Sequence, residues 1–157
     1  MNEKWMEALG GMVHGIYVLT ARYEDEINGM IASWVSQVSY EPPLVMVAIH
    51  PKRYSHSLIE GAKAFALHII STERRDFLEL FKGPDPAAKF VSLNWSKGIT
   101  GAPLLEDCLA YLECKVTNSM RPGNHTLFIG EVVNARVLSA ARPLCTLDYK
   151  GVYRGDK

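Results

Sequence analysis

Long apolar runs are missing from this chain, and so is an excess of charge of either sign. Every apolar run falls far short of the about 20 residues that a membrane-spanning helix needs, although 48% of the residues are apolar. Lysine plus arginine equal aspartate plus glutamate, at 17 each, so no overall field attracts nucleic acid or an anionic membrane. The first ten residues, MNEKWMEALG, lack the apolar segment of a signal peptide. We therefore expect a cytoplasmic protein that binds neither nucleic acid nor membrane.

Cysteine is also scarce, and the motifs of several enzyme classes are absent. Cys108, Cys114 and Cys145 are odd in number and show no CxxC spacing, which argues against a disulfide scaffold or a zinc ribbon. The five histidines lack HExxH or H-x-H spacing, so we expect no metal site. The G-x-G-x-x-G fingerprint, the P-loop and the GxSxG serine motif are missing as well. This pattern favours a bound cofactor that brings its own reactivity.

The pattern of apolar residues predicts strands along most of the chain, without repeats or linkers, so we expect a single domain over residues 1–157. Asn28-Gly29 is a strong hairpin signal between the first two strands, and the RPGN sequence at 121–124 predicts a turn between the last two. The segments predicted as strands are residues 12–21, 28–39, 44–49, 65–70, 109–117 and 126–138.

Helices are predicted only as short connectors, over residues 58–63, 72–81 and 86–90. Ser57 and Glu60 have the spacing of a capping box for the first helix, and Asp85-Pro86 supplies an N-cap and N1 pair for the third. No alternation of strands and helices indicates a doubly wound parallel sheet. These elements favour a mainly β fold, an antiparallel barrel with short peripheral helices.

The strand predicted at residues 28–39, NGMIASWVSQVS, carries no charged side chain. In an extended chain, alternate side chains share a face, so Met30, Ala32 and Trp34 lie on one face, and Ser33 and Gln37 on the other. The second face, which also holds Ser39, is mostly small or polar and suits a flat heterocycle that needs neutral hydrogen bonds. An ordinary half-buried strand is the alternative interpretation.

The segment after the third strand, HPKRYSHS at 50–57, places two cations directly before a predicted helix. Free N–H groups and the dipole at a helix start favour an anion. Lys52 and Arg53 would supply charge, and Ser55 or Ser57 a hydroxyl group. This predicts a phosphate site. A solvated turn in which Ser57 caps the helix is the alternative.

Four collinear segments resemble the flavin reductase-like FMN-binding split-barrel family: GIYVLTA from Gly15, NGMIASWVSQVSYEPPLVMVAIH from Asn28, KRYSHSLI from Lys52 and GNHTLFIGEV from Gly123. The resemblance covers roughly residues 15–137, and the tryptophan and glutamine of SWVSQVS are most similar to the flavoredoxin-like branch. It implies a six-stranded antiparallel Greek-key split barrel, a homodimer, and one FMN beside each barrel.

The resemblance also implies which positions meet the cofactor. The expected cofactor-binding residues are Asn28, Met30, Ala32, Ser33, Trp34, Gln37, Ser39, His50, Lys52, Arg53, Ser55 and Lys89. A surface position on its helix is the alternative for Lys89. The family's glycine-acid-histidine motif reads Gly123-Asn124-His125 here, without the acid. His125 is the catalytic candidate, beside the flavin or the nicotinamide, and a histidine at a strand start, hydrogen-bonded to the turn, is its alternative role.

The function that the resemblance implies is an oxidoreductase in which bound FMN takes electrons from NADH or NADPH. The acceptor would be a flavin, a metal complex or a redox protein. A flavoredoxin-like electron carrier, reduced by a protein partner such as a ferredoxin or rubredoxin, is the alternative function. A third possibility is weakly bound flavin that leaves as a product to feed a monooxygenase.

Overall fold

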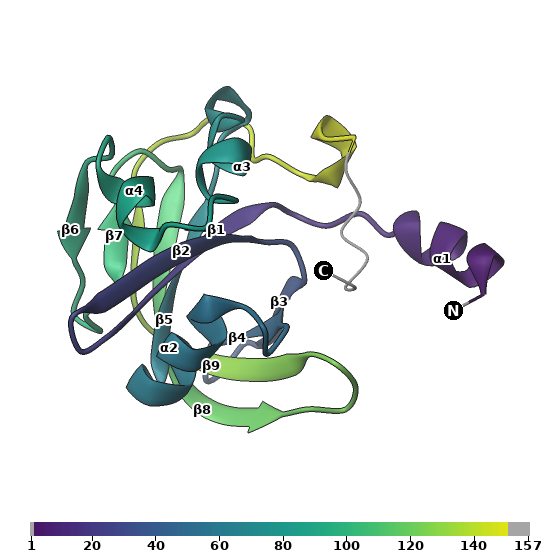
Figure 1. Cartoon of the computed structure of the whole chain (residues 1–157), viewed down its shortest axis with the longest axis horizontal. Coiled ribbons are helices and arrows are strands. Elements are labelled where there is room, and N and C mark those ends of the chain that lie inside the picture. The colour runs from purple at the N-terminus through teal and green to yellow at the C-terminus, as the bar shows by residue number, and fades with distance from the viewer. Residues whose placement is uncertain (1, 151–157) are drawn as a thin grey trace.

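Strands dominate the fold, as the sequence pattern predicts (Figure 1). A computed structural model describes residues 2–150; residue 1 and residues 151–157 of the expected domain lie outside the described part. The strands are β1 (Tyr17–Tyr23), β2 (Glu26–Ala32), β3 (Val35–Ser39), β4 (Leu44–Ile49), β5 (Ala64–Ile69), β6 (Trp95–Lys97), β7 (Pro103–Leu105), β8 (Ala110–Met120) and β9 (Thr126–Val137). The α-helices are α1 (Glu3–Gly10), α2 (Tyr54–Ala62), α3 (Phe77–Leu80) and α4 (Pro86–Phe90), with 3-10 turns η1 (Thr72–Arg74) and η2 (Thr146–Asp148).

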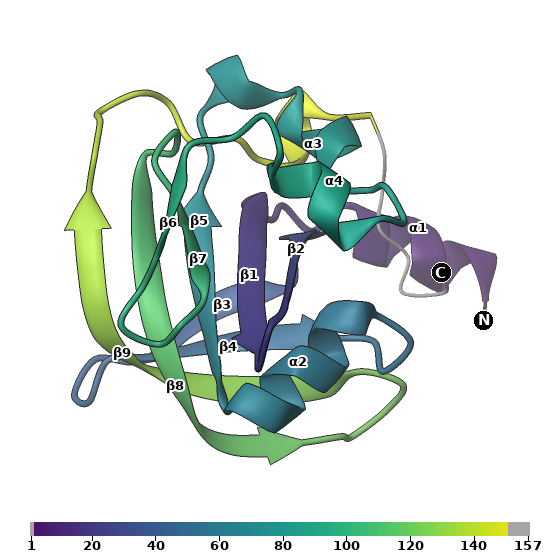
Figure 2. The ribbon, with the colours of Figure 1, turned by 60° about the vertical axis from the view of Figure 1, so that its left-hand side comes forward.

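Seven strands form one antiparallel sheet in the order β2-β1-β5-β8-β9-β4-β3, and β6 pairs with β7 in a separate hairpin. The sheet coils into a barrel, and α2 carries the chain from β4 across to β5 (Figures 1 and 2). The two edge strands, β2 and β3, follow one another in the sequence, so Ser33 and Trp34 join the two edges of the barrel. The predicted antiparallel split barrel is confirmed, with more strands than the six expected.

Two apolar clusters stabilise the barrel from its two faces. Consecutive residues Val18 and Leu19 of β1 are both fully buried because they belong to different clusters, as period-two alternation requires. The inner cluster includes Leu19, Val47, Ile59, Phe65, Leu67 and Phe128. The outer cluster includes Val18, Ile70, Phe77, Leu78, Phe81, Phe90 and Leu105. The outer cluster thus fixes α3 and α4 against β1 and β2, which positions the functional site.

Several local predictions were wrong in their boundaries. The first hairpin turns at Glu24 and Asp25, where Glu24 adopts a positive φ of 53°, whereas Asn28-Gly29 lies within β2. Here close packing explains the glycine better than turn chemistry does, because a Cβ on Gly29 would approach a ring atom of Phe81 to 2.6 Å. The predicted strand 28–39 is two strands that break at Ser33 and Trp34.

Two of the three helix predictions were also wrong in their boundaries. The capping box predicted at Ser57 is wrong. Helix α2 begins at Tyr54, four residues earlier than predicted, with Arg53 at its N-cap, and the Ser57 hydroxyl donates to the Tyr54 carbonyl at 2.9 Å. The predicted helix 72–81 is divided into η1 and α3. The prediction for α4 is confirmed, since the Asp85 carboxylate accepts from the Ala87 N–H at 3.1 Å and Pro86 occupies the first turn.

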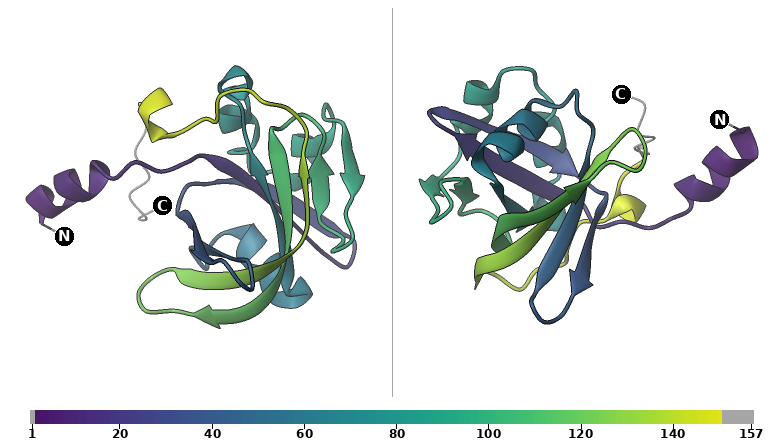
Figure 3. Two further views of the ribbon diagram at one scale, coloured as in Figure 1. Left: turned by 180° about the vertical axis from the view of Figure 1, so that it is seen from behind. Right: turned by 90° about the horizontal axis from the view of Figure 1, so that it is seen from below.

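Helix α1 stands apart from the barrel, on the side opposite the β6–β7 hairpin, and buries none of its residues (Figures 1 and 3). Among residues 2–150, none of the helices combines the length and apolarity needed to cross a membrane. Cys108 and Cys114 are buried and Cys145 is half-buried, and all three are free thiols.

Candidate functional site

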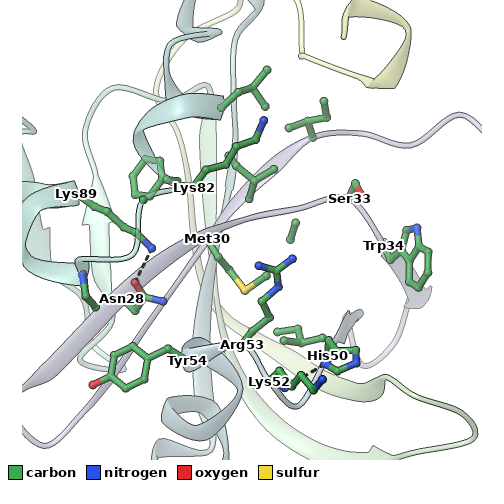
Figure 4. A pocket seen from close by; sticks show the side chains of 18 of the residues that line it. Asn28, Met30, Ser33, Trp34, His50, Lys52, Arg53, Tyr54, Lys82 and Lys89 are labelled. Carbon is green, nitrogen blue, oxygen red and sulfur yellow. Dashed lines mark hydrogen bonds between the residues drawn. The ribbon is translucent and has the colours of Figure 1, made fainter. Parts of the chain in front are cut away.

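A cavity of about 800 Å3 lies beside the barrel (Figure 4). Its walls come from β2, the junction to β3, the end of β4, the start of α2, the helices α3 and α4 with the loop between them, and the segment around η2. Predicted cofactor residues that line it are Asn28, Met30, Ala32, Ser33, Trp34, His50, Lys52, Arg53 and Lys89. Gln37, Ser39 and Ser55 are predicted cofactor residues that lie outside its lining. The structure thus brings most of the predicted residues together from four separate elements.

The junction at Ser33 and Trp34 shapes one wall of the cavity. The chain here leaves one sheet edge for the other, and the Trp34 carbonyl accepts from the Ala48 N–H at 3.0 Å. Strict alternation therefore ends at this point, and consecutive residues Ala32, Ser33 and Trp34 all line the cavity. The prediction that Ser33 faces away from Ala32 and Trp34 was wrong for this reason. The wall is uncharged, as the sequence indicates.

Lys52 and Arg53, the two cations before α2, line the cavity, and their predicted role in binding phosphate stays a prediction. Arg53 is the N-cap residue of α2, and its side chain makes no capping hydrogen bond. The His50 ring orients the approach to this helix, because its Nδ1 accepts from the Lys52 N–H at 3.1 Å. That bond requires an unprotonated Nδ1 and leaves the ring proton on Nε2 in the neutral histidine. Figure 4 shows Arg53 near the middle of the cavity and Lys52 beside His50 at one end.

Lys89 is buried, with 7% of its surface exposed, so the alternative of a surface lysine was wrong. Its ammonium group donates to the Asn28 side-chain oxygen at 3.0 Å and to the Gly29 carbonyl at 2.9 Å. Asn28 in turn donates to the hydroxyl of fully buried Ser55 at 2.9 Å. Ser55 therefore holds the Asn28 side chain from outside the cavity lining. The chain of hydrogen bonds from Lys89 through Asn28 to Ser55 connects α4, β2 and α2.

Lys89 takes part in no ion pair with the described residues of the chain. Its two acceptors are neutral, and no carboxylate among residues 2–150 forms an ion pair with it. Burial lowers the pKa of Lys89, and the positive charge of Arg53 lowers it further, while Asp85 opposes the shift. Buried charges are ordinarily paired because desolvation is costly. A lysine that lines a cavity in this state is therefore suited to an anionic ligand.

His125 does not itself line the cavity, but it contacts two residues that do. Its ring centroid lies 4.7 Å from that of Trp34 and 5.2 Å from that of His50, the latter perpendicular. His125 Nδ1 and the Asn124 side-chain oxygen are 2.7 Å apart. Burial is the main cause that lowers the pKa of His125, followed by electrostatic interactions with His50 and Arg53. The environment thus favours a neutral imidazole, and its catalytic role stays a prediction.

The sequence reasoning missed the far side of the cavity. Glu26 and Tyr54 line it as a hydrogen-bonded pair at 2.9 Å, and the other missed lining residues are Ile16, Ile31, Ala48, Ile49, Leu78, Phe81, Lys82, Gly83, Pro84, Pro86, Thr146 and Tyr149. Pro84 and Pro86 do carry a local signal, since they lie at the predicted break between two helices and at the start of the second one. Thr146 and Tyr149 carry no local signal because they reach the site only through the fold. Among the described residues, no group of three or more His, Cys, Asp or Glu could hold a metal ion.

The chain thus forms an antiparallel split barrel with a cavity that is lined by cations and by one uncharged wall. The family model described as "Flavin reductase like domain" matches residues 9–155, and the chain belongs to this family. The resemblance seen in the sequence is therefore confirmed.

Individual relatives extend the comparison. The chain is 32% identical to a high molecular weight rubredoxin of Moorella thermoacetica, over 95% of this chain and 67% of the relative. It is 34% identical to diflavin flavoprotein A 1 of Synechocystis, over 85% of this chain but only 24% of that protein, so it spans about a quarter of that relative. Among solved structures, the NADH:FAD oxidoreductase SgcE6 of Streptomyces globisporus, in complex with NAD and FAD fragments, has a TM-score of 0.82 at 26% identity, covering 91% of this chain and 86% of that one.

Proposed function

We propose that this flavin reductase-like protein binds FMN in the cavity and transfers electrons from NADH or NADPH to an acceptor. The observation that carries the proposal is Lys89, a buried cation whose hydrogen-bond acceptors are neutral, at a cavity with an uncharged wall. Such a lysine suits a phosphate group, and the wall formed by Ala32, Ser33 and Trp34 suits a flat, neutral ring. These residues fit a flavin mononucleotide, which carries both groups.

The anionic end of FMN would be held by Lys89, Arg53 and Lys52. Arg53 can donate two parallel hydrogen bonds to a phosphate, whereas Lys89 acts as a localised charge. The bond from Lys89 to Asn28, which is itself held by Ser55, fixes the ammonium before the ligand arrives. Preorganisation of this kind reduces the entropy cost of binding.

The ring of FMN would lie against the wall at residues 32–34 and the side chain of Met30. When bound, a flavin supplies the hydride-accepting and electron-transferring chemistry. The protein's residues would hold the ring in place, exclude water and offer neutral hydrogen bonds, for example from the Ser33 hydroxyl. This division of roles agrees with the lack of any hydrolytic motif in the sequence. His125 would act through Trp34 and His50, whose rings it contacts.

Two observations bear on the electron partners. The similarity to SgcE6, an NADH:FAD oxidoreductase in complex with NAD and FAD fragments, supports a nicotinamide donor. The similarity to a high molecular weight rubredoxin supports the second candidate, an electron carrier that exchanges electrons with a redox protein such as a rubredoxin or ferredoxin. A homodimer with one FMN for each chain remains part of the proposal.

An anaerobic visible spectrum tests the proposed function. The purified protein is loaded with FMN, desalted and mixed with NADH or NADPH in a stopped-flow instrument. We expect the flavin band to survive desalting and to bleach with at least one nicotinamide. Bleaching by a reduced rubredoxin or ferredoxin, with neither nicotinamide effective, would favour the carrier. A protein that retains no flavin and shows no saturable binding of FMN contradicts both.

A further inference from the structure

Lys82 lies at the cavity but away from the two cations that precede α2. Figure 4 shows Lys82 and Lys52 on opposite sides of Met30. Lys82 follows α3, in the loop that leads to α4, whereas Lys52 and Arg53 precede α2. A ligand with one phosphate that occupies the Lys89 and Arg53 side leaves the Lys82 side for another anionic group.

The ammonium group of Lys82 contacts two side chains, Tyr149 and Glu79. Its Nζ donates to the Tyr149 hydroxyl at 2.7 Å and lies 4.8 Å from the centroid of the same ring. The carboxylate of Glu79 is 3.5 Å away, but its side chain is 84% exposed, so water screens this pair. The Lys82 side chain is itself 44% exposed, and its bond to Tyr149 places the charge at the mouth of the cavity.

The short segment at η2 contributes two hydroxyl groups to the cavity lining, those of Thr146 and of Tyr149, the partner of Lys82. The Tyr149 hydroxyl accepts from Lys82, and the Thr146 hydroxyl accepts from the His14 N–H at 3.0 Å. Each oxygen is therefore used as an acceptor and retains its own proton to donate. Neither hydroxyl donates to another residue within 2–150. An ammonium with two O–H donors matches the acceptor oxygens of a phosphate group.

The segment that supplies both hydroxyls is anchored to the barrel. Leu144 is 1% exposed, and its N–H donates to the Ile70 carbonyl at 2.8 Å. The Thr146 N–H donates to the His14 carbonyl at 2.8 Å. Tyr149 packs against the outer apolar cluster, whose members Ile16, Leu78 and Phe81 also line the cavity. Phosphate donors beside an apolar surface suit a nucleotide, which carries a phosphate and a flat base.

We infer that Lys82, Tyr149 and Thr146 form a second anion subsite, which binds a phosphate group of a dinucleotide. This inference rests on the proposed function, because it assumes that the Lys89 side takes the phosphate of the flavin mononucleotide. Two dinucleotides share the required chemistry. One is FAD, whose pyrophosphate would extend from the flavin, and the other is a nicotinamide dinucleotide that binds beside FMN.

Binding measurements with Lys82→Met test the subsite without reference to turnover. The wild-type chain and the variant are titrated with FMN and with FAD by flavin fluorescence, and with oxidised NAD by calorimetry after loading with FMN. Tyr149→Phe tests the same subsite with less change in charge. Lys115→Met is the matched control, since Lys115 is exposed on β8 and lies outside the cavity lining.

We expect Lys82→Met to bind FMN within about twofold of wild type and to bind one dinucleotide about tenfold more weakly, as the loss of one charge-assisted hydrogen bond implies. Weaker FAD binding identifies a flavin dinucleotide as the ligand, and weaker NAD binding identifies a nicotinamide dinucleotide. Tyr149→Phe should weaken the same ligand less, and it decides the matter if Lys82→Met fails to fold. Unchanged binding of both dinucleotides overturns the inference, as does an equal loss for FMN.

The outcomes separate this inference from the proposed function. A wild-type chain that binds no flavin contradicts the proposed function, and NAD titration of the flavin-free chain then tests the subsite alone. A wild-type chain that binds FMN, with Lys82→Met indistinguishable from Lys115→Met for every ligand, contradicts only the second subsite.

Discussion

Replacing Lys89 by methionine should separate recognition of phosphate from recognition of the flavin ring. Methionine retains much of the apolar stem, so the packing of α4 on β2 is largely kept. The change removes an ammonium group that is buried beside two neutral acceptors. We expect FMN to bind more weakly and riboflavin, which has the same ring without the phosphate, to bind as before.

The magnitude follows from the hydrogen bonds involved. A charge-assisted hydrogen bond to a buried partner contributes about 1.5–3 kcal/mol, so FMN affinity should fall about 10- to 150-fold. The unfolding free energy of the flavin-free chain should change less, by about 2 kcal/mol at most. Two opposing effects act on it: the Asn28 and Gly29 oxygens lose a donor, which costs about 1–3 kcal/mol each, while the desolvation cost of an unpaired charge disappears.

The assay compares the dissociation constants of FMN and riboflavin by fluorescence titration, in the wild-type chain, in Lys89→Met and in the control Lys115→Met. Urea unfolding of the flavin-free chains measures stability in parallel. If Lys89→Met keeps the wild-type ratio of riboflavin to FMN dissociation constants, Lys89 does not bind the phosphate. A parallel loss for both ligands would show that the substitution disturbs the whole cavity, which also contradicts the reasoning.

The same ratio should depend on pH. Burial and Arg53 lower the pKa of Lys89. Because a phosphate group binds the charged lysine better than the neutral one, the preference for FMN over riboflavin is complete below the pKa that Lys89 has in the flavin-free protein. This preference declines as the pH rises above that pKa, and the decline begins below pH 10.5, the pKa of an ordinary lysine. Lys89→Met should lack this alkaline step.

Three further outcomes are expected. Lys52→Ala combined with Arg53→Ala should weaken FMN by at least about tenfold and change stability by less than about 1 kcal/mol; unchanged flavin occupancy after desalting would contradict a role for this pair. Ser33→Leu should block the ring and weaken FMN and riboflavin equally, whereas a mere packing change would leave both titrations as in wild type. As the pH falls from 6.5 to 4, the free energy of unfolding of the wild-type chain should fall by up to about 3 kcal/mol relative to that of His68→Gln. The reason is that burial lowers the folded-state pKa of His68 to about 4, so the unfolded chain binds the proton first. Urea unfolding across this range measures the difference in free energy, and a difference that does not change with pH refutes the prediction.

The sequence predicted the fold class and several elements well where local pattern and structure agree. The run LVMVAI forms β4 with the predicted bounds, and Asp85-Pro86 starts α4. Prediction failed where tertiary structure overrides local preference. Asn28-Gly29 lies in a strand because Phe81 packs closely on Gly29, and α2 starts before its apparent capping residue, Ser57. The alternation of apolar residues over 28–39 also could not show that the chain crosses from one sheet edge to the other at Ser33 and Trp34.

The candidate site was partly predictable for the same reasons. Residues close together in sequence, such as Lys52 and Arg53, could be predicted as one phosphate site from their position directly before a helix. The burial of Lys89 was not accessible to the sequence, since it depends on the packing of Phe81 and Phe90 against β2. Tyr149 lies 67 positions from its partner Lys82, so no local pattern could join them.

The substitution of the family's acid by Asn124 has an electrostatic consequence at His125. A carboxylate at this position would stabilise the charged imidazolium and raise the histidine pKa. The Asn124 amide oxygen, 2.7 Å from Nδ1, accepts a hydrogen bond without adding charge, and burial, His50 and Arg53 lower the pKa of His125. At neutral pH the imidazole is therefore favoured in its neutral form, with the proton on Nδ1 toward Asn124. A neutral ring packed on Trp34 suits positioning of the uncharged wall more than donation of a proton to a ligand, so the missing acid favours the alternative structural role for His125.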